Sequence, residues 1–172
     1  EGQQSRVYGA WRVDVSNCLR QRVALKILKS KNLINVWRQE FDSLNRVHSP
    51  NCVRLYGFEW LDCRPALVLE FVDGVSLRQF MQYAHLDADD IEEITAQIQR
   101  GLFDLEAQGL SHGDLSLNNV MIDGNGQIKL LDFGLANFSN GQVKTTPLFA
   151  APEVLHRNQV TLASDLYALG VV

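Results

Sequence analysis

His112-Gly113-Asp114-Leu115-Ser116-Leu117-Asn118-Asn119 decides the fold, together with Asp132-Phe133-Gly134 a little further along the chain. Between them lie two apolar segments, Val120 to Ile122 and Gln127 to Leu131, whose alternation is typical of short strands. The residues that separate these segments, Asp123-Gly124-Asn125-Gly126, tolerate the positive φ that tight turns require. The sequence therefore predicts a hairpin that brings Asp114, Asn119 and Asp132 together.

These three side chains supply two metal-binding positions and one proton acceptor. Moving the terminal phosphoryl group of a nucleotide needs little covalent chemistry from the protein, but it needs Mg²⁺ held against the phosphates. It also needs a group that orients the incoming hydroxyl. Asn119 and Asp132 suit the first task and Asp114 suits the second, so the spacing predicts a phosphoryl-transfer site.

The same stretch resembles the catalytic loop and metal-binding motif of the protein kinase superfamily. The resemblance implies an α+β, bilobal protein-kinase-like fold. Residues 1–72 would form a small N-lobe, an antiparallel sheet with one helix. Residues 73–172 would form a mainly helical C-lobe, and a hinge near residues 70–74 would join the lobes around the nucleotide. The implied activity is ATP-dependent transfer of the γ-phosphoryl group to Ser or Thr hydroxyls of protein substrates, with Mg²⁺.

A lysine stands inside the apolar strand predicted over residues 23–28, where a charge is costly unless it is paired. This is Lys26, and the resemblance implies that it binds the α- and β-phosphates. Apolar residues from Leu33 to Val47 follow helical spacing and place Glu40 beside their stripe. We therefore pair Lys26 with Glu40, and expect both to act with the three residues of the catalytic loop and hairpin.

The resemblance also implies a set of nucleotide-binding residues. Gly2 and Ser5 match the middle and third glycines of a glycine-rich loop over the phosphates, and small side chains let backbone N–H groups approach phosphate there. The remaining members would surround adenine or form the hinge: Val7, Ala24, Lys26, Leu69, Glu70, Val72, Leu77 and Met121.

Further elements are expected on either side of the hinge. Residues 52–60 and 66–71 read as strands, after a hairpin loop over residues 14–22. Ile91 to Leu105 follow helical spacing, with aspartates massed at the start where the helix dipole favours acids. By resemblance, Asp165 would brace the catalytic loop from the start of a last helix. A buried regulatory spine would consist of Leu44, Leu55, His112, Phe133 and Asp165.

The sequence departs from the family pattern at two places in the catalytic loop. Gly113 replaces the arginine before the catalytic aspartate, which removes a cation that would grip a phosphorylated activation segment, where Ser139, Thr145 and Thr146 remain candidate sites. Ser116 replaces the lysine that would neutralise charge on the transferring phosphoryl group, and this loss should slow the chemistry.

Two alternatives to a protein kinase therefore stay open. A small-molecule kinase of the aminoglycoside or choline type has a similar loop, but it lacks the segment from Thr146-Pro147 to Ala151-Pro152-Glu153, which resembles the peptide-docking region of Ser/Thr kinases. A pseudokinase scaffold would bind nucleotide without transfer.

Composition limits the other possibilities. The chain has 172 residues, 46% of them hydrophobic, and a formal net charge of −4 with scattered basic residues, so we expect no nucleic-acid partner. Three cysteines without a CxxC pair favour neither a disulfide framework nor a zinc site. No apolar run is long enough to cross a bilayer within this sequence. We expect a cytoplasmic location, and we interpret the strand-like start and apolar end as a fragment cut at both sides.

Overall fold

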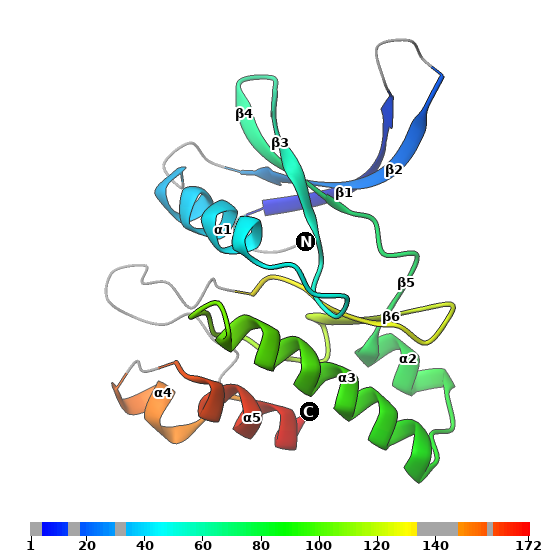
Figure 1. Cartoon of the computed structure of the whole chain (residues 1–172), viewed down its shortest axis with the longest axis vertical. Coiled ribbons are helices and arrows are strands. Elements are labelled where there is room, and N and C mark those ends of the chain that lie inside the picture. Colours follow the sequence, from blue (N-terminus) through cyan, green and yellow to red (C-terminus); the bar gives the residue numbers. More distant parts are fainter. Residues whose placement is uncertain (1–4, 14–17, 30–33, 134–147, 158–159) are drawn as a thin grey trace.

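The computed structural model describes residues 5–13, 18–29, 34–133, 148–157 and 160–172 (Figure 1). Its elements in chain order are β1 (Ser5–Val13), β2 (Arg20–Leu28), α1 (Ile34–Arg46), β3 (Leu55–Leu61), β4 (Arg64–Glu70), β5 (Gly74–Ser76), α2 (Leu77–Tyr83), α3 (Ala88–Glu106), β6 (Val120–Asp123), β7 (Ile128–Leu130), α4 (Pro152–Arg157) and α5 (Leu162–Val171).

The N-terminal strands form one antiparallel sheet in the order β1-β2-β4-β3. Central strand β4 is buried from Pro65 to Leu69, as expected for apolar residues covered on both faces. Helix α1 lies beside this sheet (Figure 1), and Phe41 meets Phe58 of β3 edge to face, with ring centroids 5.7 Å apart. The sheet and α1 together present Lys26 and Glu40 to each other.

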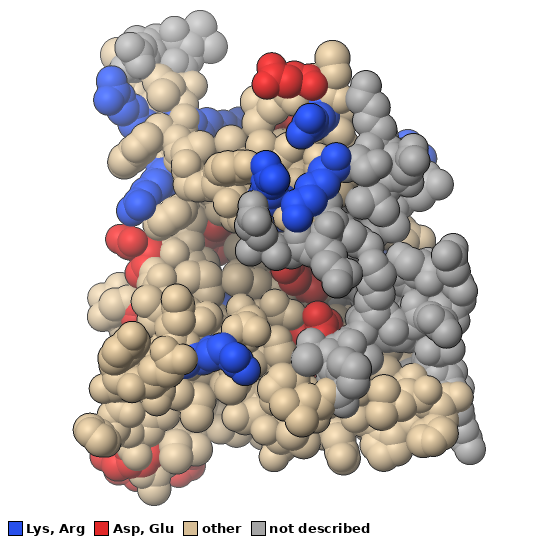
Figure 2. All heavy atoms as spheres, turned by 180° about the vertical axis from the view of Figure 1, so that it is seen from behind, with Lys and Arg blue, Asp and Glu red and all other residues tan. Residues whose placement is uncertain are grey.

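The rest of the chain is mainly helical and carries a smaller sheet, β5-β6-β7, on the side facing the N-terminal sheet (Figure 1). Helix α3 begins with a capping box in which Asp87 and Asp90 exchange side-chain and backbone contacts. Figure 2 shows the resulting acidic patch at the lower end of the molecule. The opposite face of α3 buries Ile98, Leu102 and Leu105, which belong to the main core.

This architecture confirms the predicted α+β fold class, an antiparallel N-terminal sheet with a helix followed by a mainly helical part. In the described residues no helix combines the length and apolarity needed to cross a membrane. Cys52 is buried, and burial raises the pKa of its thiol to about 12.

Several predicted boundaries were wrong, including those of β4, which was predicted over residues 66–71 and spans Arg64–Glu70. Strand β3 starts at Leu55, because Cys52 instead forms an isolated parallel bridge with Leu130, and Val53 N–H donates to the Leu130 carbonyl at 2.9 Å. Strand β2 starts at Arg20, inside the predicted loop, because it pairs with the long strand β1 as far as Val13. Strand β7 starts one residue late, because the N–H of Gln127 is taken by the turn carboxylate of Asp123 at 3.0 Å.

Candidate active site

Lys26 lies at the centre of the site and is 6% exposed. Its Nζ donates to Glu40 Oε1 at 2.5 Å and to Asp132 Oδ1 at 2.6 Å. The three residues come from β2, from α1 and from the segment after β7, so the fold joins a lysine to an aspartate 106 positions further along the chain. We call these three residues the lysine cluster.

One ammonium faces two carboxylates in this cluster. Burial alone would lower the pKa of Lys26, but the charges of Asp132 and Glu40 more than reverse this effect, so its pKa is raised and Lys26 stays protonated. Burial raises the pKa of Glu40, Lys26 opposes this rise, and the negative charge of Asp132 adds to it. The cluster therefore contains one more carboxyl group than it has ammonium groups.

Asp132 adopts the left-handed conformation, with φ 55°, which is costly for a residue other than glycine. Its side chain is 45% exposed, in contrast to that of Glu40, which is 6% exposed. The preceding residue, Leu131, donates its N–H to the Asn119 carbonyl at 2.8 Å. The hairpin β6–β7 thus brings its two ends together and places Asn119 beside Asp132.

Asn119 is oriented by the catalytic loop. Its Nδ2 donates to the Asp114 carbonyl at 2.8 Å and to Asp114 Oδ2 at 3.3 Å. These bonds use the amide nitrogen of Asn119, and neither of them uses its amide oxygen. The acid, the amide and the second acid predicted from the sequence are therefore connected through short contacts.

Asp165, at the start of α5, holds the backbone of the catalytic loop through hydrogen bonds. Its carboxylate accepts the N–H groups of His112 at 2.7 Å and Gly113 at 2.8 Å. Burial raises the pKa of Asp165 to about 6, although the two N–H donors oppose this shift. Gly113 has φ 79°, a conformation that glycine adopts without strain. The predicted bracing contact is present, and it uses both carboxylate oxygens.

His112 and Phe133 lie fully buried in the core behind the loop. Burial lowers the pKa of His112 to about 4, so the imidazole is neutral at neutral pH. Its Nδ1 accepts the Asp114 N–H at 3.3 Å, whereas Nε2 has no hydrogen-bond partner in the described part of the chain. Of the other predicted spine residues, Leu44 and Asp165 are buried and Leu55 is half-buried.

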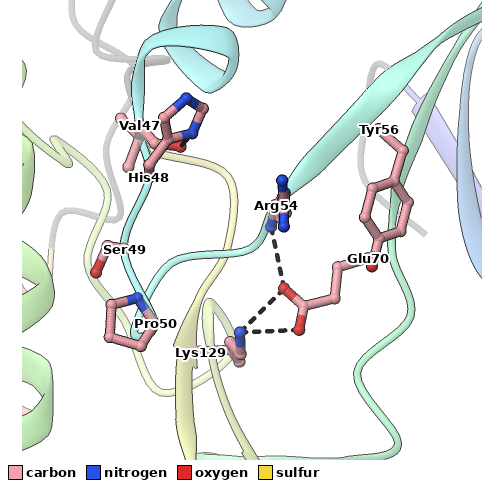
Figure 3. Close-up of a pocket in the computed structure, with 8 residues that line it drawn as sticks. All are labelled: Val47, His48, Ser49, Pro50, Arg54, Tyr56, Glu70 and Lys129. Carbon is pink, nitrogen blue, oxygen red and sulfur yellow. Dashed lines mark hydrogen bonds and ion pairs between the residues drawn. The ribbon is translucent and has the colours of Figure 1, made fainter.

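A contact that the sequence analysis missed joins β4 to β7. Lys129 Nζ lies 2.8 Å from Glu70 Oε1 and 3.0 Å from Oε2, and Glu70 Oε2 also accepts the Arg54 N–H at 3.1 Å (Figure 3). Glu70 was predicted as a hinge residue through its backbone only. The signal was available, because Lys129 stands between two apolar strand residues just as Lys26 does.

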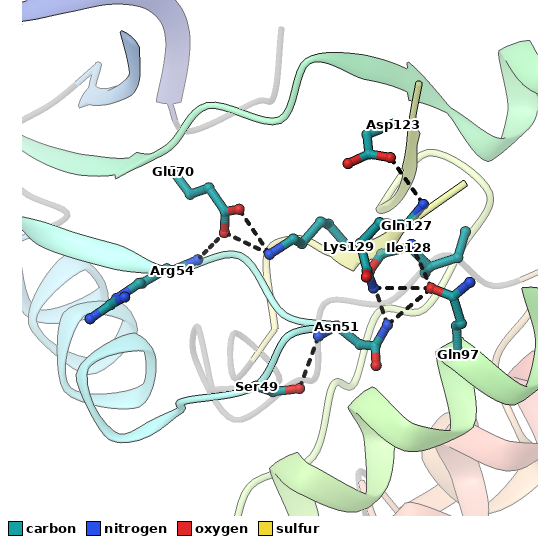
Figure 4. Close-up of polar contacts among 9 residues, drawn as sticks. All are labelled: Ser49, Asn51, Arg54, Glu70, Gln97, Asp123, Gln127, Ile128 and Lys129. Atoms are coloured by element: carbon teal, nitrogen blue, oxygen red, sulfur yellow. Dashed lines mark hydrogen bonds and ion pairs between the residues drawn. The ribbon is translucent and has the colours of Figure 1, made fainter. Parts of the chain in front are cut away.

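A second missed group holds the hairpin against α3. Gln97 Oε1 accepts the Ile128 N–H at 2.8 Å and an Nδ2–H of Asn51 at 3.2 Å (Figure 4). Gln97 Nε2 donates to the Gly126 carbonyl at 3.0 Å. Gln97 is buried on the packed face of α3, but its spacing does not reveal which groups it bonds. These bonds fix the hairpin that carries Asn119 and Asp132 at its two ends.

The predicted adenine-pocket residues fall on two sheets. In the N-terminal sheet, Val7 is paired with Lys26 and Ala24 with Leu69, so Ala24 and Lys26 share one face of β2. In the smaller sheet, Met121 is paired with Ser76, the residue before Leu77. Val7 is exposed, Ser5, Leu69 and Leu77 are buried, and Ala24, Glu70, Val72 and Met121 are half-buried.

Several predicted residues lie outside the described part of the chain. These are Gly2 in the predicted glycine-rich loop, Gly134 after Phe133, and Ser139, Thr145 and Thr146 in the predicted activation segment. Pro152 and Glu153 are described and begin helix α4.

Mg²⁺ is the metal that the resemblance implies for this site. Within the described residues no group of three or more His, Cys, Asp and Glu side chains is arranged to hold a metal. Mg²⁺ commonly binds one or two protein oxygens and completes its shell with water and substrate phosphates. One carboxylate from Asp132 and one amide oxygen from Asn119 fit that requirement, and the excess negative charge of the lysine cluster favours a cation.

The comparisons with known proteins agree with this arrangement. The family model described as "Protein kinase domain" matches residues 1–172. Mitogen-activated protein kinase kinase kinase YODA of Arabidopsis thaliana is 34% identical over 149 residues, covering 83% of this chain and 17% of its own length. Probable serine/threonine-protein kinase pknA2 of Bifidobacterium longum is 27% identical over 188 residues, covering 100% of this chain and 24% of its own length.

CBL-interacting protein kinase 12 of Oryza sativa is 30% identical over 186 residues, covering 100% of this chain and 34% of its own length. The chain thus spans about a third or less of the length of these relatives. Because the family model covers the whole sequence, and because the lysine cluster and the loop held by Asp165 lie where the resemblance requires them, the chain belongs to the protein kinase domain family.

Proposed function

We propose that this chain is the catalytic part of a protein kinase that transfers the γ-phosphoryl group of ATP to Ser or Thr hydroxyls of protein substrates. The observation that carries the proposal is the contact of Lys26 with both Glu40 and Asp132, at 2.5 and 2.6 Å. Burying a lysine between two carboxylates has a large desolvation cost. Such a cost is expected where the arrangement binds a ligand, which in this proposal is the nucleotide.

Each residue has a role that its position supports. Lys26 would bind phosphate oxygens, with Glu40 fixing its direction. Asn119 and Asp132 would hold Mg²⁺, which supplies charge neutralisation on the phosphates when it is bound. Asp114, held by Asn119, would orient the acceptor hydroxyl and take its proton, a role worth about 10²- to 10⁴-fold in rate.

Two features support the protein substrate and the type of acceptor. The sequence carries Thr146-Pro147 and Ala151-Pro152-Glu153, which resemble the peptide-docking segment of Ser/Thr kinases. Relatives such as the Bifidobacterium longum protein are named serine/threonine-protein kinases. Ser116 is buried and brings no cation to the catalytic loop, so we expect transfer to be slower than with a lysine there.

One assay tests this proposal against its alternatives. The complete protein is incubated with γ-labelled ATP and Mg²⁺, and with a generic protein substrate, an aminoglycoside mixture or choline. Label on Ser or Thr of the protein substrate, lost in Asp114→Asn, supports the proposal. Label on the small acceptors alone would instead identify a small-molecule kinase. Nucleotide binding without transfer to any acceptor would identify a scaffold.

A further inference from the structure

A cavity of about 380 Å³ opens between the loop that follows α1, the start of β3, the end of β4 and strand β7 (Figure 3). Its lining includes His48, Ser49, Arg54, Tyr56, Glu70 and Lys129. We call it the rear cavity. No residue of the lysine cluster lines it, and its volume is in the range of pockets that hold small ligands.

Hydrogen-bond donors line this cavity without being used up by the fold. The Arg54 guanidinium and the Tyr56 hydroxyl make no side-chain hydrogen bond with any described residue. Lys129 spends two contacts on the oxygens of Glu70, and an ammonium has three N–H groups, so one remains. Three different side chains therefore have donor capacity for a ligand.

The charges of the lining favour an anion. Arg54 and Lys129 are cationic, and Glu70 is the single acid among the lining residues. Both oxygens of Glu70 are already engaged, by Lys129 and by the Arg54 backbone N–H. The nearby hydroxyl of Ser49 donates to Asp104 at 2.5 Å, so that carboxylate is also engaged.

We propose that the rear cavity binds a phosphate monoester, carried by a phosphorylated side chain of a partner peptide or by a free small molecule. The guanidinium fork of Arg54 is suited to pair with two phosphate oxygens, and Tyr56 and Lys129 are the further donors of the lining. A phosphorylated group held by these donors contacts β3, through Tyr56, and β7, through Lys129, and β7 leads to Asp132. The proposal does not depend on catalysis by this chain.

The test measures binding by calorimetry to the complete protein. The probes are a degenerate phosphoserine peptide library, its unphosphorylated counterpart, and O-phosphoserine alone. We expect both phosphorylated probes, or one of them, to bind, and their comparison identifies the source of the phosphate. Arg54→Gln should weaken this binding at least about tenfold, because it removes charge-assisted hydrogen bonds. Tyr56→Phe, which deletes one hydroxyl, should weaken it by roughly threefold.

Two further variants sharpen the result. Glu70→Gln removes the acid that competes for Lys129, so it should tighten binding several-fold rather than weaken it. Arg100→Gln is the matched control, because Arg100 is an exposed arginine paired with Glu93 on α3 and does not line the cavity. The proposal is overturned if neither phosphorylated probe binds at millimolar concentration, if the unphosphorylated library binds equally well, or if Arg100→Gln weakens binding as much as Arg54→Gln.

Discussion

Two ion-pair sites join the N-terminal sheet to the strand that precedes Asp132, and they are built differently. In the lysine cluster one buried ammonium meets two carboxylates, so negative charge is in excess. In the second site, which we call the rear pair, Lys129 contacts one carboxylate, that of Glu70, so the two charges balance. Their side chains are 14% and 23% exposed. The lysine cluster also contains a residue with φ 55°, whereas Lys129 and Glu70 lie in regular strands.

The difference suits the lysine cluster to bind a metal cation, and it suits the Lys129–Glu70 pair to hold β4 against β7. An excess carboxylate beside a fixed ammonium can take a metal cation without leaving a buried charge unpaired. A balanced pair offers no such capacity, and breaking it costs only what a partly exposed ion pair contributes. We therefore expect chemistry to depend on Lys26 and the rear pair to affect mainly stability.

The largest expected effect is on activity. Lys26→Met should lower kcat/KM for phosphoryl transfer by about 10²- to 10³-fold, the range seen when one electrostatic contact to a developing charge is removed. Lys129→Met, the same substitution in the rear pair, should lower it by less than about tenfold, because Lys129 lines no part of the lysine cluster. Initial rates over a range of ATP concentrations measure both values. Equal losses in the two variants would break the comparison.

The next effect is on stability. Glu40→Ala should lower the free energy of unfolding by about 2 to 3 kcal/mol, because it removes a charge-assisted hydrogen bond to the buried Lys26 ammonium, which keeps its contact with Asp132. Glu70→Ala should lower it by about 1 kcal/mol or less, because Lys129 is near solvent and can hydrate. Urea unfolding at pH 7 gives both differences. A larger loss in Glu70→Ala would mean that the rear pair is the main structural tie.

Sequence alone was sufficient where a residue type was out of place in its pattern. Lys26 inside an apolar strand had to be paired, and Glu40 on the adjacent helix was the available acid. The hairpin turn at Asp123 to Gly126 likewise determined that Asn119 and Asp132 would meet. The α+β fold class followed from the same motifs, through the resemblance that they carry.

Sequence was insufficient where a side chain has two ordinary explanations. Lys129 stands between apolar strand residues as Lys26 does, but nothing in the sequence identifies its partner, Glu70. The partners of Gln97 likewise follow only from the tertiary structure. Strand boundaries failed for a related reason. Whether Cys52 belongs to a strand depends on its neighbour Leu130, which is 78 positions away.

The buried surroundings of the catalytic loop predict a pH effect. The pKa of His112 is lowered from 6.5 to about 4. Below pH 6.5, His112 therefore becomes protonated in the unfolded chain while it stays neutral in the native protein. Its stabilising contribution is complete above pH 6.5 and is lost as the pH falls toward 4. The stability difference between wild type and His112→Phe should therefore shrink by about 2 to 3 kcal/mol between pH 7 and pH 4.5.

Asp165 is the reason why wild type and His112→Phe must be compared at each pH. Its pKa is raised to about 6, so its contribution has the opposite sign, present at low pH and lost as the pH rises through 6. The wild-type stability alone can look flat between pH 4 and 6. Since Asp165 is present in both proteins, its contribution cancels in the difference, and a difference that is independent of pH would contradict a buried neutral His112.

The positive φ of Gly113 in the catalytic loop predicts a smaller effect. Gly113→Ala places a Cβ at φ 79° and should cost about 1 to 2 kcal/mol of stability. Gly126→Ala is the matched control, because Gly126 also has φ 79° but lies in the hairpin turn, where an added Cβ meets nothing within 4 Å. Both variants should lose similar stability, and only Gly113→Ala should also lower kcat, measured well below its melting temperature.

Salt should separate the two sites by the smallest effect. At 1 M salt the Debye length is about 3 Å, so the attraction between solvent-accessible charges is largely screened. Buried pairs are screened much less. The stability cost of Glu70→Ala should therefore fall by roughly 0.5 kcal/mol between 0.05 and 1 M NaCl. The cost of Glu40→Ala should stay constant, because its side chain and that of Lys26 are 6% and 7% exposed. Unfolding curves of wild type and both variants at the two salt concentrations give the result. A salt-dependent Glu40 difference would mean that water and ions reach the Lys26–Glu40 pair, and the contrast between this buried pair and the more exposed Lys129–Glu70 pair would then be lost.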